Sequence, residues 1–309
     1  MEASIALKSV AKGYTNRRVL SDISFGVETG TIFCVAGTSG SGKTTLTHIL
    51  ATLVQPDIGS VYIKGMQVDE NIRTVRKLFG FLPEKNTLNP ENTIFENLRI
   101  HGILAGMKPS ESVERANELL SRFELTDHAR DFPDTLSYSM RRRVAFIRAI
   151  IPKPEILLLD EPTTNVDFYT RKLLWEYLRE KRGDTTIFLT ARAVHDAEKY
   201  ADRIMILDEG RIVIDGEPET LRLDAEQGTF YNLVFQNEYE KYRQSLENNS
   251  QVEFLQQEQN SFLFRLKDGS EILKIIHEFG QDEITHFAVK ELTLNDFLVE
   301  LSEKEQLID

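Results

Sequence analysis

The chain has 309 residues and a formal net charge of −12 at pH 7, and 28% of its residues are charged. This length exceeds one ordinary domain and predicts a large domain followed by a smaller one. The acidic balance argues against a nucleic-acid partner, and the single cysteine, Cys34, excludes a disulfide framework.

Membrane insertion is not expected from the sequence. No apolar run approaches the roughly 18 residues that a bilayer-spanning helix needs, and no N-terminal export signal is visible. We therefore expect a cytoplasmic chain that reaches a membrane only through partner proteins. The six histidines are scattered without the spacing of metal ligands.

The N-terminal segment predicts antiparallel strands at 5–10 and 19–27, with Tyr14 between them. An aromatic ring upstream of a phosphate-binding loop can stack on an adenine base. A half-buried packing tyrosine is the alternative interpretation of Tyr14.

Residues 37–44 have the spacing of a phosphate-binding loop, between a predicted buried strand at 31–36 and a predicted helix at 45–52. The glycines let successive backbone N–H groups curl around an anion. Lys43 adds a cation, and the Thr44 hydroxyl is predicted to bind Mg²⁺. The predicted nucleotide-binding set is Gly37, Thr38, Ser39, Gly40, Ser41, Gly42, Lys43, Thr44 and Thr45, together with Tyr14.

Residues 84–150 predict a mainly helical insertion, in which the apolar residues of 112–123 share one helix face. The insertion ends in Leu-Ser-Tyr-Ser-Met at 136–140, followed by three arginines at 141–143 and a continuing helix. An arginine run is usually a solvated helix face, but the neighbouring motifs argue for another role here.

An uninterrupted apolar run at 156–159 ends in two acids, Asp160 and Glu161. A strand that is apolar on both faces belongs in the middle of a parallel sheet, whose carboxyl-terminal edge is where α/β proteins bind ligands. Asp160 is predicted to hold hydrated Mg²⁺. Glu161 is predicted to accept the proton of a water that attacks the γ-phosphate.

Together these motifs resemble those of the ATP-binding cassette (ABC) ATPases over about residues 3–222. GTSGSGKT resembles the Walker A loop of that family, ILLLDEP its Walker B strand with the catalytic glutamate, and LSYSMRRRVAFIRAI its signature motif and helix. The resemblance implies an α/β P-loop NTPase with a mixed sheet core, an antiparallel β part and a helical subdomain at about 84–150. The first domain is therefore predicted to span 1–222.

The resemblance also implies further roles. Tyr14 falls at the adenine-stacking loop, Glu84 at the Q-loop as a metal-binding and catalytic residue, and Asn165 and Asp167 at the D-loop. It implies a dimer that holds each ATP between one subunit's Walker loops and the other's signature. The signature residues are Ser137, Tyr138, Ser139 and Met140, and the implied catalytic residues are Lys43, Glu84, Glu161 and Arg192.

Several residues depart from the family pattern. Glu84 stands where most members have glutamine, Tyr138 and Ser139 replace the two signature glycines, and Arg192 stands at the place of the switch histidine. His195 lies nearby but on the next predicted helix. A side chain at 139 is expected to weaken dimer closure, so a heterodimer with a second ABC ATPase is an alternative to a homodimer.

From about residue 223 to 309 a second α+β unit is predicted, with helices near 231–246, 271–278 and 294–301 and strands at 252–255, 262–266 and 285–289. This part resembles the C-terminal extension of ABC-2 type drug and peptide exporters. A plain α+β cap without that function is the alternative.

The predicted function is an ATPase subunit that uses ATP and Mg²⁺ to power separate membrane subunits of an ABC-2 type exporter at the inner face of the membrane. The membrane contact is predicted near 84–96, where Leu88, Ile94 and Phe95 are apolar. A non-transport ABC ATPase, such as a translation or repair factor, and a low-turnover regulatory nucleotide sensor are the alternatives.

Overall fold

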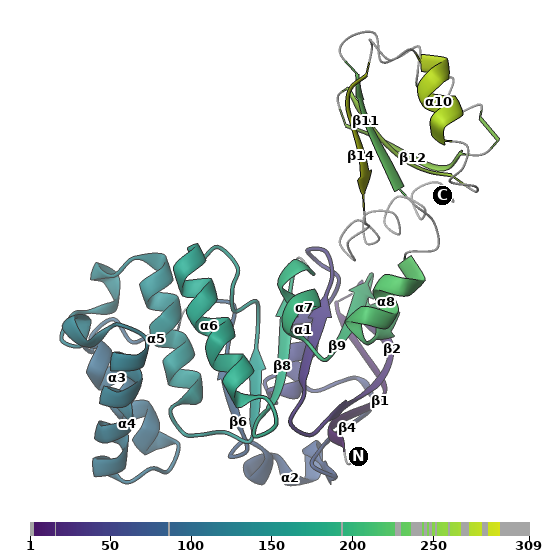
Figure 1. Cartoon of the computed structure of the whole chain (residues 1–309). Helices are drawn as coiled ribbons and strands as arrows, with labels where there is room; N and C mark the ends of the chain where they lie inside the picture. The colour runs from purple at the N-terminus through teal and green to yellow at the C-terminus, as the bar shows by residue number, and fades with distance from the viewer. Residues whose placement is uncertain are drawn as a thin grey trace. The chain divides into compact units, whose positions relative to one another are not determined.

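A computed structural model describes residues 3–15, 17–85, 87–192, 194–225, 230–235, 243, 246, 249–250, 252–258, 260–266, 272–279 and 284–290. The chain divides into two compact units, Met1–Pro218 and Glu219–Asp309. Figure 1 shows both units, and each is described by itself.

A six-stranded sheet forms the centre of the first unit. Its strand order is β10-β9-β3-β8-β7-β6, in which β6, β7, β8, β3 and β9 run parallel and β10 pairs antiparallel with β9. The bounds are Ile32–Ala36 (β3), Phe79–Leu82 (β6), Ile156–Leu159 (β7), Thr186–Ala191 (β8), Arg203–Asp208 (β9) and Arg211–Gly216 (β10). Every residue of β3 and β7 is buried, because both strands lie inside the sheet and are apolar on both faces.

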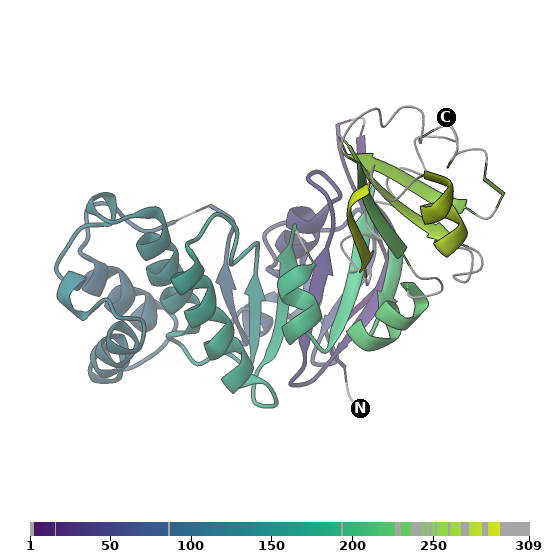
Figure 2. The same ribbon diagram turned by 45° about the horizontal axis from the view of Figure 1, so that its top comes forward.

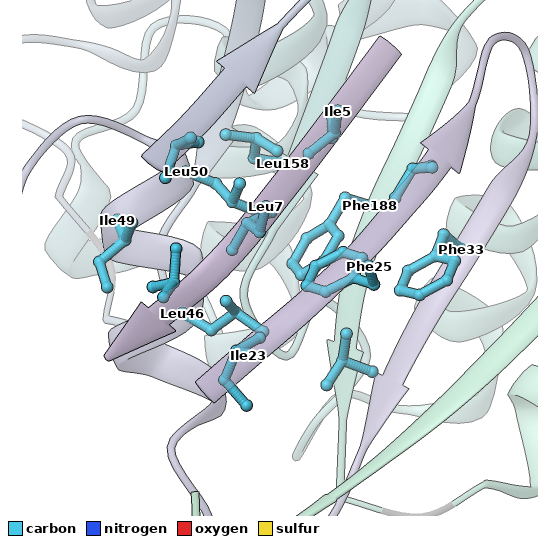
Figure 3. Packing of buried hydrophobic residues seen from close by; sticks show 14 of the residues in the cluster. Ile5, Leu7, Ile23, Phe25, Phe33, Leu46, Ile49, Leu50, Leu158 and Phe188 are labelled. Carbon is cyan, nitrogen blue, oxygen red and sulfur yellow. The ribbon is translucent and has the colours of Figure 1, made fainter. Parts of the chain in front are cut away.

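A second, antiparallel sheet has the order β2-β1-β4-β5, with bounds Ala3–Tyr14 (β1), Arg17–Glu28 (β2), Ile58–Ile63 (β4) and Met66–Gln67 (β5). Helix α1 (Lys43–Leu50) buries Leu46, Ile49 and Leu50 in the core that β1 and β2 share with the central sheet. Figure 3 shows this packing. Phe25, Phe33 and Phe188 stack on one another, with ring centroids 5.3 Å (Phe25–Phe33), 6.0 Å (Phe33–Phe188) and 6.3 Å (Phe25–Phe188) apart. This core fixes the start of α1, and with it the loop before the helix.

A helical part lies beyond β6, as Figures 1 and 2 show. It contains α3 (Ile94–Leu104), α4 (Pro109–Arg122) and α5 (Tyr138–Ile150), with short 3₁₀ turns at Thr126–His128 and Pro133–Thr135. A capping box of Thr93 and Glu96 starts α3. The other helices of this unit are α2 (Val68–Val75), α6 (Phe168–Lys181) and α7 (His195–Tyr200).

The second unit contains an antiparallel sheet of order β12-β13-β11-β14 and the helix α10 (Ile272–Phe279). The strands are Phe230–Phe235 (β11), Val252–Glu258 (β12), Ser261–Leu266 (β13) and Ile284–Lys290 (β14), and α8 (Pro218–Ala225) crosses the unit boundary. Buried side chains of α10, β11 and β13, including Leu233, Phe264 and Ile275, form a separate core. The predicted helix near 231–246 is wrong at its start, because Tyr231, Leu233 and Phe235 alternate inward along β11. The predicted helix at 294–301 lies outside the described residues.

Candidate functional site

The loop at 37–42 joins β3 to α1 and is shaped by close backbone approaches. A Cβ atom at Gly37 would lie 2.1 Å from the Leu207 carbonyl oxygen, so only glycine fits there. Gly42, the N-cap residue of α1, has φ of 109°, a conformation that favours glycine. Gly40 has open space around its Cβ position. Thr38, Ser39 and Gly40 are exposed, so the tip of the loop faces solvent.

Lys43 lies across this loop. Its side chain is 4% exposed, and its ammonium donates to the carbonyl oxygens of Gly37 and Thr38 at 2.8 Å and 2.7 Å. Burial lowers the pKa of Lys43, while Glu161, Asp160 and Glu84 act in the opposite direction. The ammonium therefore lies within electrostatic reach of three carboxylates at the carboxyl-terminal edge of the sheet.

Asp160 and Glu161 follow β7 at that edge, and one hydroxyl links them. Thr190, near the end of the neighbouring strand β8, donates to Asp160 Oδ1 at 2.7 Å and accepts the backbone N–H of Glu161 at 2.9 Å. Glu161 has φ of 47°, in the left-handed region that is uncommon for a residue with a side chain. The two acids are thus held in fixed directions although they are adjacent in sequence.

The second carboxylate oxygen of Asp160 is left without a protein partner. Asp160 is completely buried, and its Oδ2 atom makes no hydrogen bond. A buried carboxylate oxygen without a donor is costly, and it is the kind of hard oxygen ligand that Mg²⁺ binds. The residues present therefore fit a magnesium ion beside the loop that is shared with a bound phosphate, although among the described residues no three acidic, histidine or cysteine side chains are placed so that they alone could hold a metal ion.

Glu84 and Arg192 meet at the same edge. Glu84 follows β6, and Arg192 follows β8. Arg192 donates from Nε to Glu161 Oε2 at 2.6 Å and from a terminal nitrogen to Glu84 Oε1 at 3.0 Å. The hydrogen bond to Glu161 is the main cause that raises the pKa of Arg192, so its charge is fixed. The structure thus joins two residues that depart from the family pattern, Glu84 and Arg192.

Arg142, from the arginine run, holds the backbone beneath these carboxylates. It is 2% exposed and donates to backbone carbonyl oxygens of two segments. In the segment after β6 the distances are 2.5 Å and 3.0 Å. In the segment after β7 they are 2.7, 2.9 and 3.3 Å. Its five acceptors are Pro83, Glu84, Asp160, Glu161 and Pro162. Burial lowers the pKa of Arg142.

Arg142 and Thr190 were given no role by the sequence analysis. The arginine run was noted as unlike a solvated face, which is confirmed for Arg142 because this side chain is buried. The signal for Thr190 is a hydroxyl that follows the apolar run at 187–189, beside the strand that carries the paired acids.

The predicted signature and D-loop residues also lie together. Ser137 caps α5 by accepting the N–H of Met140 at 3.2 Å. The Ser139 hydroxyl accepts the backbone N–H of Asp167 at 3.0 Å. A side-chain hydrogen bond from the same hydroxyl to the Asp167 carboxyl is the main cause that lowers the pKa of Asp167. The Ser139 side chain therefore binds the D-loop of its own chain. Asn165 in that loop has φ of 59°.

Tyr14, Thr44 and Thr45 are less closely tied to the rest of the site. Tyr14 ends β1, is 45% exposed, and lies with its ring centroid 5.5 Å from the Lys12 ammonium. Among the described residues, no hydrogen bond or ring contact joins Tyr14 to the loop at 37–42. Thr44 and Thr45 are half-buried in the first turn of α1.

Comparison with known proteins agrees with this geometry. The ABC transporter family model matches residues 20–164. A daunorubicin resistance ATP-binding protein of Streptomyces coeruleorubidus is 34% identical over 225 residues, which cover 72% of this chain and 71% of that protein. The chain belongs to the ABC transporter family. It is an ATP-binding ABC ATPase, as the sequence predicted.

Similarity to one relative extends along nearly the whole chain. Nod factor export ATP-binding protein I of Cupriavidus metallidurans is 29% identical over 306 residues, which cover 99% of both chains. Among solved structures, an ATP-binding subunit of an ABC transporter has a TM-score of 0.67 at 29% identity, covering 72% of this chain and 93% of that chain. A dimeric ATP-binding cassette in a post-hydrolysis state with ADP and Pi has a TM-score of 0.65 at 28% identity, covering 69% and 98%. The predicted ABC ATPase fold is confirmed by these neighbours.

Proposed function

We propose that this chain is the ATP-hydrolysing subunit of an ABC-2 type exporter, and that it closes as a dimer around MgATP to drive separate membrane subunits. The observation that carries the catalytic part is the buried Asp160 carboxylate with its unpartnered Oδ2, beside Glu161 and the Lys43 ammonium. The relatives named for drug resistance and Nod factor export support the transport part.

The binding roles follow from where each group lies. The loop amides and the start of α1 bind the phosphates, and Lys43 exchanges its carbonyl contacts for phosphate oxygens. Thr44 and Asp160 would hold Mg²⁺, with Glu84 as a further oxygen ligand, and the ion would neutralise charge on the phosphates. The Tyr14 ring stacks on adenine.

Glu161 is the general base in this proposal. Its carboxylate is 6% exposed, and its backbone is fixed by Thr190 and Arg142. A carboxylate held in this way accepts the proton of a water positioned in line with the γ-phosphate, a contribution of typically about 10²- to 10⁴-fold in rate.

Dimer closure brings the signature of one chain onto the nucleotide of the other. Ser137, Tyr138, Ser139 and Met140 form that surface, and Tyr138 is 43% exposed. Ser139 accepts a hydrogen bond from Asp167 of the same chain, so its side chain is directed toward its own D-loop segment. A homodimer and a heterodimer with a second ABC ATPase are the two arrangements, and the activity of the chain alone decides between them.

The surface for the membrane subunits is proposed at the segment after Glu84 and the start of α3. Ile94 is completely buried and does not belong to this surface, while Leu88 and Phe95 are half-buried. Arg148 donates to the Thr87 carbonyl at 2.6 Å and ties this segment to α5. Among the described residues, no helix is long and apolar enough to cross a membrane. The transport pathway is assigned to partner chains because the relatives are named as ATP-binding proteins of drug resistance and Nod factor export.

Co-expression with the neighbouring membrane protein tests the transport role. A cysteine at Phe95 is expected to cross-link to the membrane subunit, whereas a cysteine at Leu104, at the exposed far end of the same helix, is not. The variant Lys43→Ala is expected to lose ATP binding and transport while the cross-link persists. Cross-links from Phe95→Cys that join only ATPase chains contradict the proposed surface, and transport by Lys43→Ala contradicts the energy-coupling role.

A further inference from the structure

Arg192 bridges two carboxylates that come from different strands of the central sheet. Its Nε atom donates to Glu161, and a terminal nitrogen donates to Glu84, at 2.6 Å and 3.0 Å. Glu161 follows β7 and is almost buried, whereas Glu84 follows β6 and its side chain is 41% exposed. One guanidinium group therefore connects the segment proposed to face the membrane subunits with the proposed general base.

The backbones of both acids are held without Arg192. Arg142 donates to the Glu84 and Glu161 carbonyl oxygens, and Thr190 accepts the Glu161 N–H. These contacts hold the backbone only, and they do not set the direction of either carboxylate side chain. Arg192 fixes this direction, because a guanidinium presents donors in a rigid planar fork that can engage two acceptors at once.

Charge balance makes the two contacts depend on one another. The Lys43 ammonium feels both signs of charge at this edge: the carboxylates of Glu84, Asp160 and Glu161 raise its pKa, and the Arg192 guanidinium lowers it. Replacing Arg192 with a neutral residue leaves Glu84 and Glu161 facing each other without a cation between them. Replacing Glu84 with glutamine removes that repulsion, so the same loss of Arg192 then costs less.

We propose that Arg192 is a positioning residue matched to Glu84: it orients the Glu161 carboxylate and is required because residue 84 is also a carboxylate. This inference rests on the proposed function of Glu161. It assigns a shared role to Glu84 and Arg192, the two residues at this edge of the sheet that differ from the residues most family members carry. The arginine contacts the base and not the loop, so its loss lowers turnover and leaves nucleotide binding intact.

The test is a double-mutant cycle of Arg192→Gln, Glu84→Gln and the double variant in the full chain. The kcat of Arg192→Gln is expected to fall about tenfold, and the product of the two single losses is expected to exceed the loss of the double variant by about fivefold. The part of any effect of Glu84→Gln on Mg²⁺ binding that does not depend on Arg192 occurs on both arms of the cycle and cancels. The KM for ATP and the Kd for ATP with Mg²⁺ chelated are expected to stay within about twofold of wild type in Arg192→Gln.

A second readout does not depend on turnover. The same cycle measured in the thermal midpoint of the nucleotide-free chain is expected to show coupling of about 2 °C, the size of an ion pair in a domain of this length. Arg203→Gln is the matched control, because Arg203 makes a two-point ion pair with Asp215 away from this site, and its kcat is expected to be unchanged.

Two outcomes overturn the inference. In the first, the double variant loses kcat by the product of the two single losses to within about twofold, and its thermal midpoint shifts by their sum; Arg192 and Glu84 then act independently. A Kd for ATP without Mg²⁺ that rises together with the fall in kcat assigns Arg192 to nucleotide binding instead. A wild-type chain that binds no ATP contradicts the proposed function. The thermal cycle does not depend on ATP, and it still decides whether Arg192 and Glu84 are coupled.

Discussion

Replacing Arg142 with methionine should destabilise the first unit more than any comparable change in the arginine run. The side chain is 2% exposed and makes five hydrogen bonds to carbonyl oxygens. The three bonds to Asp160, Glu161 and Pro162 are buried. Methionine fills much of the same volume but offers no donor, so these oxygens lose their partner. A hydrogen bond to a charged group contributes about 1.5–3 kcal/mol, but five bonds that share one guanidinium do not add. We expect a loss of about 3–5 kcal/mol in the free energy of unfolding.

The assay can follow one unit alone, because the chain has a single tryptophan. Trp175 lies in α6, is 2% exposed and stacks on Tyr200, so its fluorescence reports unfolding of the first unit. Urea unfolding of Arg142→Met should show the loss, and Arg141→Met is the matched control. Arg141 is half-buried with one short bond, 2.7 Å to the Leu136 carbonyl, and its replacement should cost about 1 kcal/mol. Equal stability of the two variants refutes the assignment of Arg142 as the support of the site.

Two further predictions concern a half-buried histidine and a buried hydroxyl. Burial, with Arg148 nearby, lowers the pKa of His101 from 6.5 to about 4. Between these pH values the unfolded chain binds a proton on His101 that the folded chain does not. The free energy of unfolding therefore falls as the pH falls through this window, by up to about 3 kcal/mol. His101→Gln should lose less stability than wild type between pH 7 and pH 4.5 in urea unfolding; an identical pH dependence contradicts the assignment. Thr190→Val removes the hydroxyl that links Asp160 and Glu161 and should lower kcat by about tenfold or more. The control is Thr186→Val, at the opposite end of the same strand, where the hydroxyl bonds Gly30 and Ser4; this variant should change stability but not kcat. Equal kcat values for the two valine variants contradict the role of Thr190.

Local sequence signals were sufficient for the parts of the site that are continuous in the chain. The strand, loop and helix at 32–50 follow from apolar runs that flank a glycine pattern, and Asp160 and Glu161 follow from the end of a buried strand. Contacts between distant segments were not predictable in this way. The bonds of Arg142 and Arg192 join residues that are 18 to 108 positions apart, and which carbonyl or carboxylate faces a guanidinium depends on how strands β6, β7 and β8 align.

The error at the start of the predicted helix near 231–246 has a simple physical origin. Phe230–Phe235 is short, and its apolar residues suit either a strand or a buried helix when only the sequence is considered. Its pairing with β13 and β14 decides for a strand, because Tyr231 and Leu233 then reach the core of the second unit. Such pairing with residues about 30 to 60 positions away cannot be inferred from local periodicity.

In the proposed mechanism, Glu161 takes the proton in ATP hydrolysis at a site formed by the loop at 37–44 and Asp160. This role is tested by comparing ATP binding and single-turnover hydrolysis in wild type and Glu161→Gln. Glutamine keeps the shape of the side chain and can still meet Arg192, but it cannot accept the proton. We expect an unchanged Kd for ATP, turnover lower by about 10²-fold or more, and a dimer that persists with uncleaved ATP bound. Turnover by Glu161→Gln at the wild-type rate would show that Glu161 is not the base.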